Sequence, residues 1–158
     1  MPRLRNADVL AVIALGGALG SLGRWGLGRL VPHDTGQFAW STFVENVAGA
    51  FVLGALMVLL LEVWPPNRLV RPFLGVGVLG GFTTFSSYML DTQDLLRAGR
   101  PGAALLYLFG TLLFGLLASW SGVAVTRAIV EARHRRDLRT RHTEQQHPHP
   151  ARVEGEAS

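Results

Sequence analysis

The stretch GVGVLGGFTTFSSYML, residues 75–90, combines a glycine pair, a threonine pair and a serine pair with interleaved aromatic side chains. Adjacent Gly80 and Gly81 make a rupture of a helix feasible, because glycine is a poor helix former. A rupture leaves carbonyl oxygens without their i+4 donors, and such oxygens bind hard cations such as Na⁺. The hydroxyls can donate hydrogen bonds, and the ring edges of Phe85 and Tyr88 carry positive potential. The stretch therefore predicts contacts with ions, and a glycine-kinked packing helix is the simpler alternative.

Two other apolar segments carry polar groups that membrane spans rarely tolerate without a function. GGALGSLGRWGLGRL contains Arg24, and STFVENVAGAFVLGAL contains Glu45 and Asn46. Arg24 either extends to the membrane interface, attracts an anion in a vestibule, or forms a structural ion pair. The Asn46 amide offers donors either to another helix or to an anion. Glu45 lies either at the membrane edge or in a pair with Arg24.

A third apolar segment carries a polar stripe at helical spacing. Its members, each four residues apart, are Tyr107, Thr111, Gly115 and Ser119. Residues at this spacing share one helical face. The stripe is therefore either a set of contacts between helices or the lining of a pore.

The chain as a whole is that of a membrane protein. It has 158 residues, of which 49% are hydrophobic. Crossing the apolar part of a bilayer takes about 20 helical residues. Four segments meet that length: Val9 to about Val31, Trp40 to about Val63, Pro72 to Leu90, and Ala103 to about Val130. The absence of cysteine excludes thiolate chemistry, and no motif of a soluble enzyme is present. We therefore expect a function within or across the bilayer, and no enzyme.

Charge predicts two domains and a topology. Residues 1–130 form the transmembrane domain, and residues 131–158 form an Arg/His-rich tail that we expect to be disordered. An even number of spans places both termini and the 64–71 loop on one side. That side carries most of the arginines, so it is predicted to be cytoplasmic. Without the tail the bias is slight, because Arg29, Arg97 and Arg100 fall on the opposite side.

Four motifs together carry a resemblance to a known family. They are GGALGSLGRW, TFVENVAGAF, GVLGGFTTFSSY and Y-x-x-x-T-x-x-x-G-L, one in each span. With these motifs the chain resembles the CrcB/Fluc family of fluoride channels over roughly residues 10–127. The resemblance implies an all-α protein with four transmembrane helices, the third broken at mid-membrane, in an antiparallel, dual-topology-type dimer. It also implies passive exit of cytoplasmic fluoride through two pores, each lined by both subunits.

The resemblance also implies site residues. A structural Na⁺ on the dimer axis is held by backbone carbonyls, here those of Gly80 and Thr83. Arg24 takes the place of the first-span arginine, in a vestibule or structural role. The residues expected along the fluoride pore are Asn46, Thr84, Phe85, Ser87, Tyr88, Tyr107 and Thr111.

Three positions depart from the family pattern. Tyr88 replaces the second phenylalanine, Thr111 replaces the common serine, and Glu45 stands where small or apolar residues are usual. Glu45 leaves open a second function, a proton-coupled small-ion or small-molecule exporter. A non-conducting scaffold is a third alternative. The arginine-rich tail favours a single orientation, so the dimer partner is either a second copy or an oppositely oriented paralogue.

Overall fold

The computed structural model describes residues 6–65 and 67–146, with side chains for 6–65 and 67–135. Its elements, in chain order, are α1 (Ala7–Leu30), α2 (Trp40–Val58), η2 (Leu59–Val63), η3 (Pro72–Leu79), α3 (Gly80–Phe82), α4 (Phe85–Arg97) and α5 (Pro101–Gln146). No strand occurs in the described ranges.

The predicted number of membrane spans is confirmed. The described part of the chain has four helical stretches long and apolar enough to cross a membrane: Ala7–Leu30, Trp40–Val63, Pro72–Arg97 and Pro101–Arg135. The third stretch continues beyond Leu90, where we had expected it to end, as far as Arg97. Asp91, the first residue after the expected end of this span, therefore lies within α4.

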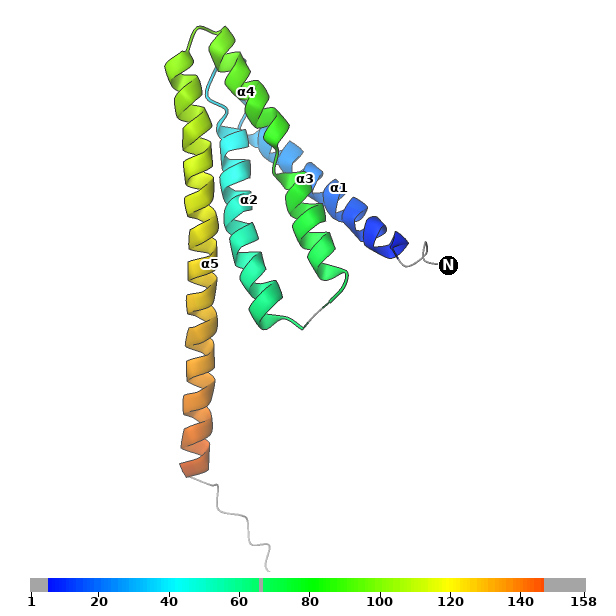
Figure 1. Cartoon of the computed structure of the whole chain (residues 1–158), viewed down its shortest axis with the longest axis vertical. Coiled ribbons are helices and arrows are strands. Elements are labelled where there is room, and N and C mark those ends of the chain that lie inside the picture. The colour runs from blue at the N-terminus through cyan, green and yellow to red at the C-terminus, as the bar shows by residue number, and fades with distance from the viewer. Residues whose placement is uncertain (1–5, 66, 147–158) are drawn as a thin grey trace, which may run out of the picture.

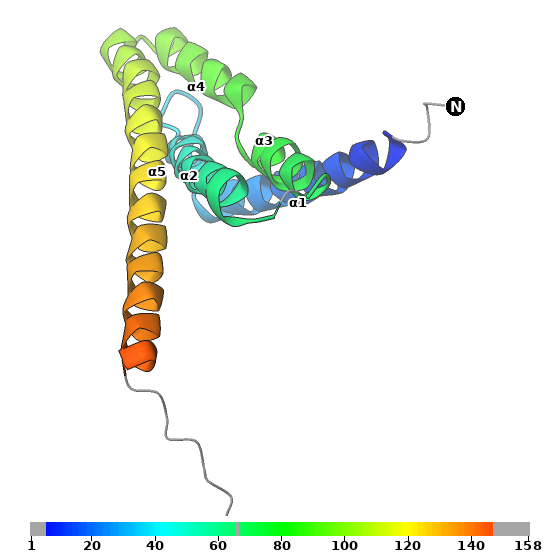
Figure 2. The ribbon, with the colours of Figure 1, turned by 60° about the horizontal axis from the view of Figure 1, so that its bottom comes forward.

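The helices pair in two groups. The middle part of α5 lies beside α2, while η3 and α3 lie against α1 (Figures 1 and 2). At one end of the bundle, Arg68 bonds to Asp8 at the start of α1. At that same end, Arg127 of α5 donates to Glu62 of η2 over 2.6 and 2.9 Å. The first contact joins the start of α1 to the η2–η3 connection, and the second joins η2 to the later part of α5.

The buried core lies at the opposite end, between α2, α4 and α5. Its largest fully buried side chains are Tyr107 and Leu95. The Phe38 ring meets the Tyr107 ring edge-on, with centroids 4.9 Å apart. Arg100 donates to the carbonyl of Gly36 over 3.3 Å and so joins the two loops at this end. This core fixes the start of α2 relative to α4 and α5.

Close approach of backbones joins α1 to η3 and α3. A Cβ on Gly20 would lie 2.1 Å from the carbonyl oxygen of Val78, and one on Gly81 would lie 2.4 Å from that of Gly17. Neither position has room for a side chain. Small residues allow helices to approach closely in membranes, where apolar burial alone gives little association energy.

Gly80 and Gly81 are themselves helical, which differs from our expectation. Gly80 has φ −66° and ψ −31°. Extended backbone begins later, at Thr83 (φ −79°, ψ 153°) and Thr84 (φ −146°, ψ 122°). We had expected the helix to break at the glycine pair. Gly81 instead stays helical and allows the close contact with Gly17 of α1. Gly81 thus permits close packing, whereas a Cβ on Gly80 would have nothing within 4 Å.

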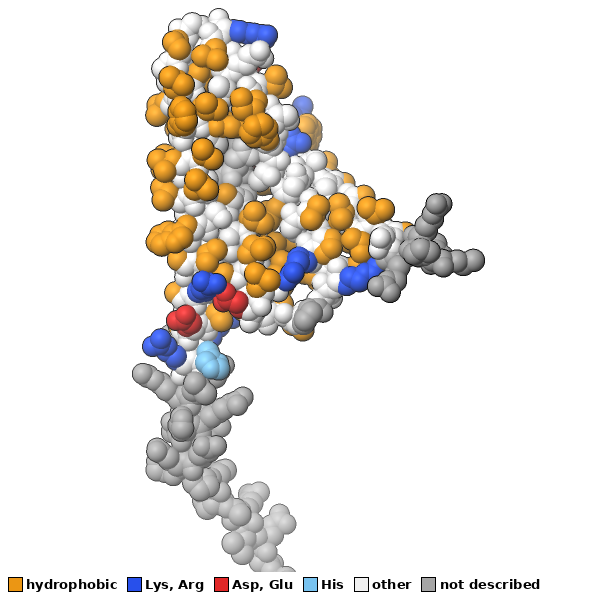
Figure 3. Space-filling model, in the orientation of Figure 1, with side chains coloured by type: hydrophobic (Ala, Val, Ile, Leu, Met, Phe, Trp, Pro, Cys, Tyr) orange, Lys and Arg blue, Asp and Glu red, His pale blue; other side chains and the backbone are white. Residues whose placement is uncertain are grey.

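The outer surface is strongly apolar. Hydrophobic side chains cover the visible faces of α5 and its neighbours (Figure 3). Leu106, Phe109 and Trp120 of α5 are 69%, 62% and 71% exposed. Such a surface is costly in water and is the one that a membrane-spanning bundle presents to lipid.

The last helix is longer than we expected. It continues through Gln146, whereas the sequence suggested disorder from residue 131. Residues 131–146 contain neither glycine nor proline and are rich in arginine, glutamate and glutamine, which favour helix. Glu131 and Arg135 form an i,i+4 pair at 3.9 Å. The rest of the predicted tail, residues 147–158, lies outside the described residues, and its separation as a domain stays a prediction.

Substitution of Gly20 tests the close packing of α1. We expect Gly20→Ala to lower stability by about 1–3 kcal/mol, because the new Cβ meets the Val78 carbonyl. Gly17→Ala is the matched control, since a Cβ there has nothing within 4 Å. Thermal unfolding of the purified protein in detergent measures both. Equal melting temperatures for the two variants would contradict this account of the packing.

Candidate functional site

A reciprocal pair of hydrogen bonds holds the extended backbone at Thr84. The Asn46 side chain donates from Nδ2 to the Thr84 carbonyl over 3.0 Å. The Thr84 amide donates back to Asn46 Oδ1 over 2.9 Å. In a continuous helix that amide would bond to the carbonyl of Gly80. The asparagine of α2 thus replaces helical hydrogen bonds that the third span loses.

Side-chain hydroxyls restart the helix after the extended residues. Thr84 is the N-cap of α4, and its Oγ1 accepts from the amide of Ser87 over 3.2 Å. Its hydroxyl also donates to Ser87 Oγ over 3.1 Å. Thr83 Oγ1 donates to the carbonyl of Leu79 over 2.8 Å. Ser/Thr caps of this kind are typical of helix N-termini. Three of the hydroxyls that drew attention in the sequence therefore have local partners.

A cavity of about 390 Å³ lies between α2, α4 and α5 and includes the extended residues. Five of the seven residues expected along the pore line it: Asn46, Thr84, Phe85, Tyr88 and Thr111. Ala50, Gly115 and Ser119 line it as well, so one small-residue face of α2 meets the polar stripe of α5. The structure thus gathers most of the predicted pore residues around one cavity.

Within the part of the chain that the structure describes, Thr111 differs from the other buried polar side chains in its hydrogen bonding. The residue is 6% exposed. Among the described residues, its Oγ1 is the one buried side-chain nitrogen or oxygen atom without a hydrogen-bond partner. An unpaired buried hydroxyl costs about 1–3 kcal/mol. Because Thr111 lines the cavity, this atom is positioned to serve something other than the fold.

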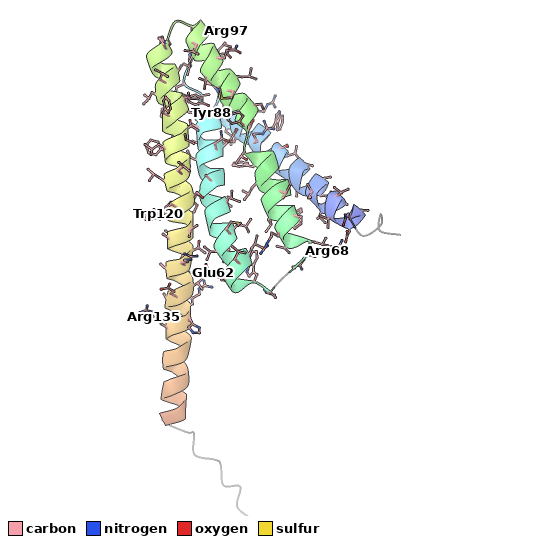
Figure 4. All side chains as sticks on the ribbon, viewed as in Figure 1. Glu62, Arg68, Tyr88, Arg97, Trp120 and Arg135 are labelled. Atoms are coloured by element: carbon pink, nitrogen blue, oxygen red, sulfur yellow. The ribbon has the colours of Figure 1, made fainter. Side chains whose placement is uncertain are left out.

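Two aromatic rings line the cavity in different ways. Phe85 is 74% exposed, so most of its ring lies outside the subunit. Tyr88 is buried, and its hydroxyl donates to the carbonyl of Leu108 in α5. Figure 4 shows Tyr88 on α4 close to α5. The hydroxyl that distinguishes this tyrosine from phenylalanine therefore ties the two helices together.

Tyr107 and Ser87 lie apart from this cavity. The Tyr107 ring is fully buried and its hydroxyl donates to Asp91 Oδ2 over 3.0 Å. Ser87 lines a neighbouring cavity of about 450 Å³. Arg24 and Glu45 line that neighbouring cavity too.

The neighbouring cavity collects charged groups from four parts of the chain. Arg24 Nε donates to the carbonyl of Gly81 over 3.1 Å, so the arginine supports the third span. Glu45 is 4% exposed. Among the described residues it forms no ion pair with Arg24, although both face the same cavity. The Glu45–Arg24 pair considered from the sequence is therefore absent from the described contacts.

Sequence reasoning missed two members of this charged cavity. His33 Nε2 lies 3.5 Å from Asp91 Oδ1, and His33 Nδ1 lies 3.4 Å from Ser41 Oγ. His33 lies in the first loop, where no helical spacing relates it to other residues. Asp91 follows Tyr88 by three residues on α4. If the helix had been predicted to continue past Leu90, Asp91 would have been placed on the same face as Tyr88.

Gly80 and Thr83 line a third cavity. It has a volume of about 350 Å³, and Asn46 contributes to its wall. The usual donor to the Gly80 carbonyl, the Thr84 amide, bonds to Asn46 instead. Among the described residues no group of three or more His, Cys, Asp or Glu side chains could hold a metal ion. Any cation at this place would therefore depend on backbone oxygens.

Comparisons with known proteins agree on one family. The family described as "CrcB-like protein, Camphor Resistance (CrcB)" matches residues 11–123. The "Fluoride-specific ion channel FluC 3" of Streptomyces avermitilis is 49% identical over 140 residues, 89% of this chain and 67% of the relative. "FluC 2" of the same organism is 53% identical over 107 residues, 68% of each chain. A "Fluoride-specific ion channel FluC" of Thermus thermophilus is 49% identical over 120 residues, 75% of this chain and 95% of the relative.

Removal of the Asn46 amide tests its role in holding the third span. We expect Asn46→Ala to lower the stability by about 2–3 kcal/mol, because the amide and carbonyl of Thr84 both lose their partner. Gln37→Ala removes an exposed amide that bonds to Asp34, and we expect a change within about 0.5 kcal/mol. Melting temperatures in detergent compare the two. An Asn46→Ala protein as stable as Gln37→Ala would refute the proposed support.

Proposed function

The chain belongs to the CrcB-like family, and from this premise we propose that it is a fluoride-specific ion channel that lets cytoplasmic fluoride leave the cell passively. When fluoride leaves the cell down its concentration gradient, its toxicity to the cell is reduced. The single observation that carries the proposal is the cavity lined by Asn46, Phe85, Tyr88 and Thr111, with the unpartnered hydroxyl of Thr111 in its wall.

The chemistry of this cavity suits a small, strongly hydrated anion. A dehydrated fluoride needs hydrogen-bond donors in place of water, and conduction requires that each contact be weak enough to break. The Thr111 hydroxyl is a neutral donor, and ring edges such as that of Phe85 carry positive potential. Arg24, which would hold an anion more tightly, lines the neighbouring cavity instead. In this proposal it attracts fluoride at the mouth of the path.

The path is completed by a second subunit in our proposal. Phe85 is 74% exposed although it lines the cavity, so one wall of the cavity faces outward. We expect an antiparallel partner to cover that side and to add donors of its own. The partner is a second copy or an oppositely oriented paralogue. The occurrence of two relatives in Streptomyces avermitilis supports the second form.

A Na⁺ ion between the subunits is part of the proposal. The carbonyl of Gly80 lacks its usual helical donor, and Thr83 is extended, so both oxygens fit a hard cation without displacing a helical bond. When bound, Na⁺ supplies a fixed positive charge that lowers the cost of an anion in a region of low dielectric constant. The chain's own contribution is to hold the carbonyls in place through Asn46.

The proposed placement in the cell membrane follows from the same elements. The extended residues 83–84 lie between the two helical parts of the third span, and we place them near mid-membrane. Non-helical backbone is tolerated at that depth when it is buried in protein or lines an aqueous path. The arginines of the 64–71 loop and of the later part of α5 favour a cytoplasmic position for both termini.

Anion efflux from liposomes tests the function. We expect the purified chain to release fluoride quickly and to retain chloride, and we expect a pH gradient to leave the fluoride rate unchanged. Glu45→Gln serves as the control for the exporter alternative, since it removes the buried carboxylate while keeping its shape. Efflux that needs a proton gradient and is lost in Glu45→Gln would show that the protein is a coupled exporter and not a channel. A chain that is inactive alone but active with a paralogue identifies a heterodimer, whereas inactivity in both cases refutes the proposal.

Thr111 gives a second test that separates stability from conduction. We expect Thr111→Val to unfold at the same or a higher temperature, because it removes an unpartnered buried hydroxyl. The rate of fluoride efflux should fall by about tenfold or more, because the variant loses one hydrogen bond to the anion. Thr111→Ser keeps the hydroxyl and should conduct. Full conduction by Thr111→Val would show that the Thr111 hydroxyl does not contact the conducted fluoride.

A further inference from the structure

A cavity of about 630 Å³ lies at the end of the bundle where the η2–η3 connection joins the second and third spans. It is separate from the three cavities described above and shares none of their residues. Its polar wall is formed by Asn67, Arg68 and Arg71, and Trp64 stands beside them. We propose that this cavity binds the phosphodiester headgroup of an anionic phospholipid such as phosphatidylglycerol.

The location of the cavity is that of a lipid headgroup. The second span ends at Val63 and the third begins at Pro72, so the connection between them lies at the membrane surface. Trp64 is the first residue after the second span and is 41% exposed. Tryptophan is enriched at this level of a membrane, where one part of its ring contacts lipid and its N–H contacts polar groups.

Charge favours an anionic headgroup over a neutral one. The two arginines of the cavity contribute two positive charges, and none of the described residues that line it is acidic. Arg71 donates to the carbonyl of Leu60 at 3.4 Å, a long hydrogen bond that a phosphate oxygen could replace. Arg68 bonds to Asp8, but both side chains are about half exposed, and such ion pairs contribute little. A guanidinium can bind a phosphate through two N–H groups at once.

The surroundings of the cavity strengthen the attraction. Figure 3 shows arginine side chains gathered along this end of the bundle, where α5 leaves it. In the part of α5 beyond the bundle, residues 131–146, the sequence has five arginines and three acidic residues. Arginines near an anionic membrane surface each contribute about 1 kcal/mol of binding. By its sequence, this segment has a net positive charge, which adds to the attraction between the protein and anionic lipid.

The other half of the cavity suits the lipid's glycerol and upper acyl chain. Leu60, Val70 and Pro72 provide its apolar wall. A soluble phosphate would use only the arginine side, whereas a phospholipid contacts both. The two walls together point to a phospholipid as the occupant.

Lipid retention by the full chain tests the proposal. The protein is purified in a mild detergent, mixed with phosphatidylglycerol or phosphatidylcholine, and examined by native mass spectrometry. We expect the unaltered chain to retain phosphatidylglycerol and not phosphatidylcholine. Arg68→Gln/Arg71→Gln should bind phosphatidylglycerol about 25-fold more weakly, from two arginines at about 1 kcal/mol each. Arg97→Gln is the matched control, since Arg97 lies at the opposite end of the molecule (Figure 4), and it should bind normally.

Several outcomes would overturn the proposal. Equal retention of the two lipids by the unaltered chain would contradict it, and this measurement does not depend on the folding of any variant. Unchanged phosphatidylglycerol binding in the double variant would also contradict it. So would a loss of phosphatidylglycerol binding in Arg97→Gln as large as that in the double variant. Competition by inorganic phosphate at the same concentration as the lipid would identify a site for free phosphate instead. Melting temperatures accompany each variant to show that it is folded.

Discussion

The structure depends on one pair of hydrogen bonds, those between the Asn46 side chain and the backbone of Thr84. A helix that becomes extended inside a membrane leaves amide and carbonyl groups without water to satisfy them. Asn46 satisfies one of each with a single side chain, and the hydroxyl of Thr84 then begins α4. The same bonds free the Gly80 carbonyl from its helical donor. Support of the extended backbone and a Gly80 carbonyl without its helical donor are thus two results of one interaction.

Two different kinds of contact hold the helices around this point. Backbones of α1 and of η3–α3 meet directly, because Gly20 and Gly81 have no side chains to separate them. The α4–α5 side uses side chains, with Tyr107 bonded to Asp91 and Tyr88 bonded to the carbonyl of Leu108. Tyr88 therefore keeps its ring at the cavity while its hydroxyl strengthens the helix contact. The cavity lies beside these side-chain contacts of α4 and α5.

Charged groups are sorted by position along the bundle. Arg24, Glu45, His33 and Asp91 gather around a cavity next to the one lined by Thr111. Arg68 and Arg71 lie at the end where the second and third spans connect, with Arg127 of α5 paired to Glu62 nearby. The polar groups that line the Thr111 cavity are neutral. A path for an anion through neutral donors, with arginine at its mouth, is consistent with binding that is weak enough for conduction.

Four spans, a helical fold, the family resemblance and most of the cavity residues could be predicted from the amino-acid sequence. Those conclusions depend on the length of apolar segments and on polar residues whose presence in a membrane needs a reason. Sequence reasoning misjudged the role of Gly81, because a glycine that allows packing and one that allows a break look alike in a sequence. It also could not show that Thr111 lacks a partner, that Tyr107 bonds to Asp91, or that His33 approaches the same carboxylate. These facts join residues from separate helices and loops, so only the tertiary structure decided them.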